Sequence, residues 1–166
     1  MFDSLKKLFS AAANGNTFII KAPVSGEAVP LSEVPDPTFS EELLGKGAAI
    51  IPTDGRVLSP VDGKVLGIFR TCHAVTLKAE DGAEILIHIG LDTVKLDGEY
   101  YTPHVKKGDM VTVGQLLIEF DLEAVKSAGY NTITPVLVCN TEEFKAIEGK
   151  LGTVKAGDPL ITLTPA

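Results

Sequence analysis

Short apolar runs alternate with turn residues along most of this chain. The runs are rich in Val, Ile, Leu and Phe, and the residues between them are mainly Gly, Asp and Pro, as at Asp81-Gly82. This pattern is typical of β-strands joined by tight turns. It predicts strands near residues 17–20, 57–58, 65–69, 74–77, 85–89, 110–113, 116–120, 136–138 and 160–163.

Helical patterns are few and short. Residues 39–44, 122–128 and 142–147 each suit a helix of about two turns at most. A parallel sheet would need longer crossover helices between its strands. The sequence therefore predicts an all-β fold, an antiparallel β-sandwich or barrel of short strands with a few short helices, in one domain over residues 17–166.

Two pairs of segments resemble each other within the chain. Residues 22–29 (APVSGEAV) recur as residues 59–66 (SPVDGKVL), and residues 105–111 (VKKGDMV) recur as residues 154–160 (VKAGDPL). We interpret them as internal duplicated hairpins. Unrelated turns of similar chemistry are the alternative.

Residues 1–16 differ from the rest of the chain. On a helix, Phe2, Leu5, Leu8 and Phe9 would share one face, with two lysines opposite. We predict a flexible tail, and leave open whether it makes a weak amphipathic contact with a membrane or is a frayed end. Its apolar stretch is too short for a signal peptide, and no run of the chain is long enough to span a membrane. The prediction is a cytoplasmic protein, with peripheral contact at the inner face of the membrane as an open question.

Charge narrows the choice of partners. The formal net charge is −7, and the sequence pI is about 4.9. Such a protein repels nucleic-acid phosphates, so we predict no nucleic-acid partner and favour basic protein partners. Cys72 and Cys139 lie far apart without a CxxC motif, which suits a reducing compartment.

Two of the three histidines lie in predicted strands. His88 interrupts an apolar run, and on a continuing strand Gly90, Asp92 and Val94 would lie on its side. His73 lies in the preceding strand, with Thr71 two residues before it. A hairpin turning at residues 81–82 places residue 73 opposite about residue 90, so Thr71, His73, His88 and Gly90 converge.

Several chemistries could use two imidazoles. Catalytic zinc normally has three protein ligands, and only two are present here, so no metal or cofactor is required. A zinc ion shared by His73 and His88 and completed by a partner remains open. Cys72 adjoins His73 in sequence and points to the opposite face, which disfavours a cysteine nucleophile. A neutral imidazole is itself a nucleophile at pH 7, so phosphoryl transfer fits this pair.

These residues lie in motifs that resemble the glucose-type enzyme IIA (EIIA) phosphocarrier family of the bacterial phosphoenolpyruvate-dependent sugar phosphotransferase system. The run EILIHIGLDTVKLDGE, residues 84–99, is the most specific part. Other matching segments follow in order over most of the chain: 22–26, 33–39, 45–52, 59–63, 71–74, 108–117 and 134–136. The fold implied by the resemblance is a small antiparallel β-sandwich.

The resemblance also implies roles for the histidines. His88 would take a phosphoryl group from the phosphohistidine of the small carrier HPr and pass it to a cysteine of a IIB domain of a sugar permease. His73 would donate to the phosphoryl oxygens, with Thr71 orienting an imidazole.

The docking face implied by the resemblance includes acidic and apolar residues. Its partner-binding positions are Asp36, Phe39, Gly90, Asp92 and Val94. Regulated transporters or metabolic enzymes are further candidate partners.

Two other classes of protein remain as alternatives. A non-catalytic regulatory binding module of the same fold would keep the acidic rim and the apolar face without needing paired histidines. A lipoyl- or biotinyl-type carrier is suggested by the hairpin pattern at residues 105–117, but it would need an exposed lysine with its recognition residues at a hairpin tip, and we find none in the sequence.

Overall fold

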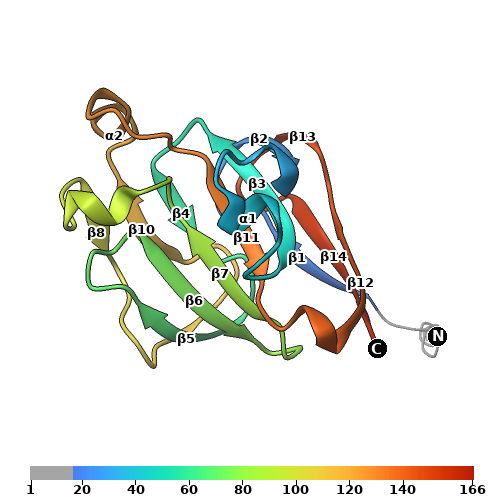
Figure 1. Cartoon of the computed structure of the whole chain (residues 1–166). Helices are drawn as coiled ribbons and strands as arrows, with labels where there is room; N and C mark the ends of the chain where they lie inside the picture. The colour runs from blue at the N-terminus through green and yellow to red at the C-terminus, as the bar shows by residue number, and fades with distance from the viewer. Residues whose placement is uncertain (1–16) are drawn as a thin grey trace.

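Every strand pairing in the computed structural model, which describes residues 17–166, is antiparallel (Figure 1). The large sheet has the spatial order β13 (Gly152–Val154), β2 (Gly26–Pro30), β3 (Lys46–Pro52), β11 (Thr134–Val138), β7 (Glu84–His88), β6 (Ala74–Ala79), β5 (Gly63–Ile68) and β9 (Met110–Val111). Two three-stranded sheets have the orders β4 (Arg56–Leu58), β10 (Leu116–Phe120), β8 (Tyr101–Pro103) and β1 (Phe18–Lys21), β14 (Pro159–Pro165), β12 (Phe144–Gly149). The predicted all-β class is confirmed.

Helical segments in the described residues are short. The two α-helices are α1 (Pro37–Ser40) and α2 (Leu122–Ser127), and the 3-10 turns are η1 (Leu31–Glu33), η2 (Thr93–Leu96) and η3 (Thr141–Glu143). Asp36 caps α1, because its carboxylate accepts the N–H of Thr38 at 3.0 Å. Glu42, with a φ of 59°, has the left-handed backbone that ends this segment. The helix predicted at residues 39–44 therefore lies slightly earlier in the chain.

The third predicted helix is wrong. Residues 142–147 form the turn η3 followed by strand β12, which pairs with β14. Pairing to a neighbouring strand overrides the weak helical pattern of this segment. The sequence pattern also misses strand β3, which is rich in small residues because β11 passes very close to Gly47. A Cβ added at Gly47 would meet the carbonyl oxygen of Val136 at 2.0 Å. Strands β2, β8, β12 and β13 are also absent from the predicted set.

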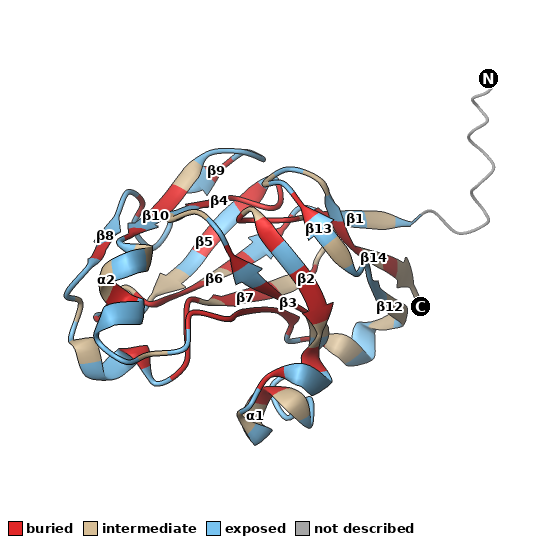
Figure 2. Cartoon of the chain, turned by 90° about the horizontal axis from the view of Figure 1, so that it is seen from above, coloured by how far each residue is buried: buried red, intermediate tan, exposed pale blue. Residues whose placement is uncertain are grey.

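The large sheet is buried on both faces near its centre. Along β7, Ile85 and Ile87 face the main core, which also contains Ile118 and Ile161 of the two smaller sheets. Leu86 belongs to a second apolar cluster on the opposite face. The segment with α1 contributes to that second cluster and lies on the outer side of the sheet (Figure 2). A strand in such a position is apolar along its length, so His88 at the end of β7 stands out.

The duplicated segments share local geometry. In the turn of segment 105–111, the N–H of Lys106 donates to Asp109 Oδ2 at 2.9 Å. In the turn of segment 154–160, the N–H of Lys155 donates to Asp158 Oδ2, also at 2.9 Å. The other pair of segments leads into β2 and β5, both strands of the large sheet.

The β6–β7 hairpin has a turn of three residues and not two. The N–H of Ala79 donates to the carbonyl of Ala83 at 2.8 Å, so residues 80–82 form the turn. Ala74 is therefore opposite His88. Residue 73 is thus opposite residue 89, one residue from the predicted position of about 90, because that prediction counted outward from a two-residue turn.

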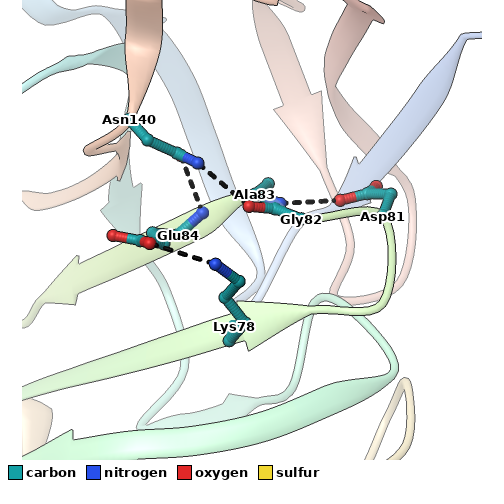
Figure 3. A network of polar contacts seen from close by, with 6 residues as sticks. All are labelled: Lys78, Asp81, Gly82, Ala83, Glu84 and Asn140. Atoms are coloured by element: carbon teal, nitrogen blue, oxygen red, sulfur yellow. Dashed lines mark hydrogen bonds and ion pairs between the residues drawn. The ribbon is translucent and has the colours of Figure 1, made fainter. Parts of the chain in front are cut away.

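Asn140 ties this turn to the residues after β11 (Figure 3). Its side chain donates to the carbonyl of Gly82 and accepts the N–H of Glu84, both at 2.9 Å. Asn140 is 5% exposed, whereas the neighbouring Lys78–Glu84 ion pair is partly open to solvent. The buried amide therefore holds the hairpin in its register.

Candidate functional site

The two ends of the β6–β7 hairpin bring His73 and His88 together. His88 is the last residue of β7, and His73 lies one residue before β6. Strand alternation alone would send residues 73 and 74 to opposite faces. Cys72, with a φ of 61°, instead turns the chain before His73. The two imidazole centroids are 4.9 Å apart with an interplanar angle of 81°, so the predicted convergence is observed, although His73 reaches it from a turn.

His88 has one ring nitrogen committed to the backbone. Its Nδ1 is 2.7 Å from the carbonyl oxygen of Gly90. A carbonyl only accepts hydrogen bonds, so Nδ1 carries the hydrogen and donates it. Burial lowers the pKa of His88, against the raising effects of the Gly90 carbonyl and of the Asp36 and Asp92 carboxylates. The neutral ring at pH 7 therefore has its lone pair on Nε2.

His73 is the more deeply buried histidine. It is 2% exposed, and its Nδ1 shares a hydrogen bond of 2.7 Å with the hydroxyl of Thr71. Burial, and next the neighbouring His88, lower the pKa of His73 from 6.5 to about 4. His73 is thus neutral at pH 7. The contact expected between Thr71 and an imidazole is present.

Aromatic rings enclose the histidine pair. Phe39 of α1 lies against His88, with centroids 5.0 Å apart. Phe39 is only 4% exposed, so it supports the ring of His88 and is not the exposed apolar contact that we expected. Phe69 meets His73 edge to face at 5.3 Å and is 47% exposed. Sequence analysis missed Phe69 as a residue of the site. The one feature that could have indicated it is that Phe69 is a large apolar residue beside the turn that contains Thr71.

The chain leaves strand geometry directly after His88. Gly90 has a φ of 86° and Asp92 a φ of 59°, and the turn η2 follows. The predicted strand alternation through residue 94 is therefore wrong. Gly90 is buried and serves His88 through its carbonyl, so it is not an open contact for a partner. A Cβ at this position would meet Cγ2 of Thr93 at 2.6 Å.

The rim of the site is acidic and partly apolar. Asp36 and Asp92 lie within Coulombic range of His88 and line a groove of about 360 Å³ with Lys95 and Tyr130. Asp92 is exposed, and Val94 is 50% exposed. The structure therefore places Asp36 and Asp92 near His88, and Val94 is an exposed residue of the adjoining turn η2.

Residues 17–166 contain no group of three or more His, Cys, Asp and Glu side chains placed to hold a metal ion. In the same range, no helix has the length and apolar character needed to cross a membrane. The predicted tail, residues 1–16, lies outside the described residues.

The described chain is thus a β-sandwich protein whose site is a pair of neutral imidazoles. Residues 18–144 match the family described as phosphoenolpyruvate-dependent sugar phosphotransferase system, EIIA 1. The chain belongs to this family of phosphotransferase-system components.

Relatives of the chain agree with this assignment. The glucose-specific EIIA component of Oceanobacillus iheyensis is 45% identical over 159 residues, which cover 95% of each protein. The beta-glucoside-specific EIIBCA component of Bacillus subtilis is 49% identical over 93% of this chain. This chain spans only about a quarter of that EIIBCA protein and of its Dickeya chrysanthemi counterpart.

A solved structure shares the fold. The glucose permease IIA of Mycoplasma capricolum has a TM-score of 0.82 and 36% sequence identity, covering 89% of this chain and 96% of that chain.

Proposed function

We propose that this protein is a phosphocarrier that accepts a phosphoryl group on Nε2 of His88 from the phosphohistidine of HPr and passes it to a cysteine of a IIB domain. The observation that carries the proposal is the hydrogen bond from His88 Nδ1 to the Gly90 carbonyl, which leaves Nε2 as the nucleophile. The EIIBCA relatives, whose names combine IIA with IIB, support a IIB partner.

The proposed transfer balances at each step. In the first step, the P–N bond to the donor histidine breaks as a P–N bond to His88 Nε2 forms. In the second step, that bond breaks as a P–S bond forms on the thiolate of the acceptor cysteine, and His88 leaves as the neutral imidazole. The phosphorylated ring carries positive charge while Nδ1 keeps its hydrogen, and the Gly90 carbonyl with Asp36 and Asp92 stabilises that charge.

His73 would assist without forming a covalent bond. If Thr71 donates its hydroxyl hydrogen to Nδ1, then Nε2 of His73 keeps the ring hydrogen and can donate it to a phosphoryl oxygen. The transition state of phosphoryl transfer is loose and spreads charge over these oxygens, so a placed donor stabilises it.

We propose that partners dock over Val94 and Phe69, with Asp36 and Asp92 attracting basic groups at the rim. Two further roles are proposed. Regulated transporters or metabolic enzymes could use the same face. A zinc ion shared by His73 and His88 would need its remaining ligands from a partner, since tetrahedral zinc has four positions. Zinc titration with and without a bound partner would test the second role.

We propose a cytoplasmic location for this carrier, with residues 1–16 making a weak contact with anionic membranes and residues 17–166 acting as one domain. The apolar and basic residues of segment 1–16 support the membrane contact. Co-sedimentation with anionic vesicles tests it, and equal binding by the protein and its Leu8→Glu variant would contradict it.

The central experiment is incubation with phosphoenolpyruvate, enzyme I and HPr, followed by intact mass. We expect one added phosphoryl group that is labile in acid and stable in base. His88→Ala should abolish the label, whereas His104→Ala should keep it, because His104 is an exposed residue paired with Glu119. A label that persists in His88→Ala would overturn the assignment.

The competing function is a non-catalytic regulatory module of the same fold. It predicts partner binding but no phosphorylated species in the same incubation. The mass measurement therefore separates the two functions directly.

A further inference from the structure

The peptide group that joins Ile89 to Gly90, one residue after His88, is held by two buried hydroxyls. The carbonyl of Ile89 accepts hydrogen bonds from Thr93 at 2.7 Å and from the hydroxyl of Tyr101 at 2.9 Å. Thr93 is fully buried and Tyr101 is 7% exposed. A carbonyl oxygen has two lone pairs, so side chains use the full accepting capacity of this group.

Hydrogen bonds hold the peptide planes on both sides of Gly90. The preceding plane contains the carbonyl of Ile89. The following plane contains the Gly90 carbonyl and the N–H of Leu91, which donates to the carbonyl of Asn131 at 2.9 Å. Because peptide groups are planar, these bonds fix the direction of the Gly90 carbonyl that meets His88.

Tyr101 reaches this peptide from a different sheet. It lies on β8, and its ring stacks on Phe120 of β10 with centroids 5.8 Å apart and an angle of 15°. The ring belongs to the main core, where a phenylalanine would supply similar apolar packing. Burying a hydroxyl is unfavourable unless it is hydrogen-bonded. The hydrogen bond to the Ile89 carbonyl is therefore what distinguishes Tyr101 from a phenylalanine at this position.

We propose that the hydroxyls of Tyr101 and Thr93 are positioning groups for His88. By holding the Ile89 carbonyl, they keep the Gly90 carbonyl on Nδ1–H and the lone pair of His88 on Nε2. The inference deepens the proposed phosphocarrier function and rests on it for its kinetic consequence. The effect on the His88 tautomer is independent of any partner.

The test removes each hydroxyl without changing the shape of the side chain much. The variants are Tyr101→Phe, Thr93→Val and the double variant. Tyr100→Phe is the matched control, because it removes a neighbouring hydroxyl from an exposed residue. The first measurement is the ring ¹⁵N chemical shifts of His88 at pH 8, which report the fraction of each neutral tautomer.

We expect wild type and Tyr100→Phe to hold the hydrogen on Nδ1. The double variant should show at least a tenfold higher fraction of the other tautomer, and each single variant a smaller rise in the same direction. If the double variant does not fold, the single variants decide. Unchanged tautomer fractions in folded variants would overturn the proposal.

The second measurement is single-turnover transfer from phosphorylated HPr. We expect the double variant to be about tenfold slower, with Tyr100→Phe unchanged. Failure of the wild type to accept phosphate would instead refute the phosphocarrier function. The ¹⁵N measurement would still judge the positioning role in that case.

Discussion

At the scale of the residue, the hydrogen on each imidazole decides what the site can do. His88 donates through Nδ1 to a carbonyl, which leaves its lone pair on Nε2, the atom proposed as the nucleophile. His73 shares Nδ1 with a hydroxyl, which can donate or accept, so its ring can present a hydrogen at Nε2. Two identical side chains thus acquire different roles from their hydrogen-bond partners.

Replacing His73 by Gln tests this division of roles. The variant keeps a hydrogen-bond donor, so His88 should still accept phosphate. Transfer to the IIB domain should slow by about 10²-fold, because the flexible glutamine amide does not hold its donor at the position of the imidazole Nε2–H. Rapid-quench measurement of both half-reactions checks this, and an unchanged second half-reaction would mean that His73 is structural.

The pKa of His73 has a consequence for stability. Burial lowers the pKa of His73 in the folded protein to about 4, from an ordinary value of 6.5. Between these pH values the unfolded chain binds more protons, so the free energy of unfolding falls as pH drops from 6.5 to 4. This contribution is on the order of 3 kcal/mol.

Urea unfolding at pH 7 and pH 4.5 measures this effect. His73→Gln removes the titrating ring, so its free energy of unfolding should vary less between the two pH values than that of wild type. The remaining dependence should include His88, whose pKa is also lowered. Equal pH dependence in both proteins would contradict the expected effect.

The sequence predicts which polar residues form the site better than it predicts how the fold places the residues around them. Thr71, His73 and His88 follow from polar residues in or beside apolar runs. Phe69 and the buried position of Phe39 do not, because neither residue has a distinctive local pattern. The role of the Gly90 carbonyl also depends on a positive φ, which sequence alternation does not show.

At the scale of the element, the β6–β7 hairpin sets the distance between the imidazoles. Its register depends on the three-residue turn and on the amide of Asn140 (Figure 3). A shift of one residue would send one histidine to the opposite face of the sheet. The turn is therefore important to the site although it lies at the far end of the hairpin.

Asn140→Ala should lower the free energy of unfolding by about 1–3 kcal/mol, because it leaves the Gly82 carbonyl and the Glu84 N–H without their partner. Glu84→Gln is the control, since it disrupts only a partly exposed ion pair, worth about 0–1 kcal/mol. Urea unfolding of the two variants compares them. A loss no larger in Asn140→Ala than in the control would show that the amide does not hold the hairpin.

Strand elements were predictable where apolar runs were long. Strands β6, β7 and β10 follow from their runs, whereas β3 contains small residues that pack against β11. Most of segment 142–147 forms a strand because it pairs with β14. β14 lies near this segment only in the folded chain, so the local sequence does not show the pairing. Long-range pairing and packing therefore account for these two misassigned segments.

At the scale of the whole molecule, the net charge of −7 acts through its distribution. Asp36 and Asp92 place two carboxylates at the rim of the site. Asp36 also caps α1, so a test of its charge must keep the cap. Asn caps helices and tolerates a left-handed backbone, which suits positions 36 and 92 respectively.

The double variant Asp36→Asn/Asp92→Asn should accept phosphate from HPr a few-fold more slowly than wild type at low salt, because rim charges steer the encounter. The difference should shrink as salt shortens the Debye length towards about 8 Å. Glu148→Gln on β12 is the control, an exposed carboxylate of a different sheet. Stopped-flow rates against ionic strength measure this, and rates equal to the control at low salt would assign the acidic rim to solubility alone.

The unequal burial of the two rings has a kinetic consequence. His73 is 2% exposed and Phe39 lies against His88, so little of the imidazole pair is open to a partner. Under the proposed function, the donor and the acceptor both need Nε2 of His88, so they exclude each other. The donor and the acceptor must then bind in turn, and an excess of either one competitively inhibits the other. The concentration ratio of the two partners therefore sets the lifetime of the phosphorylated protein.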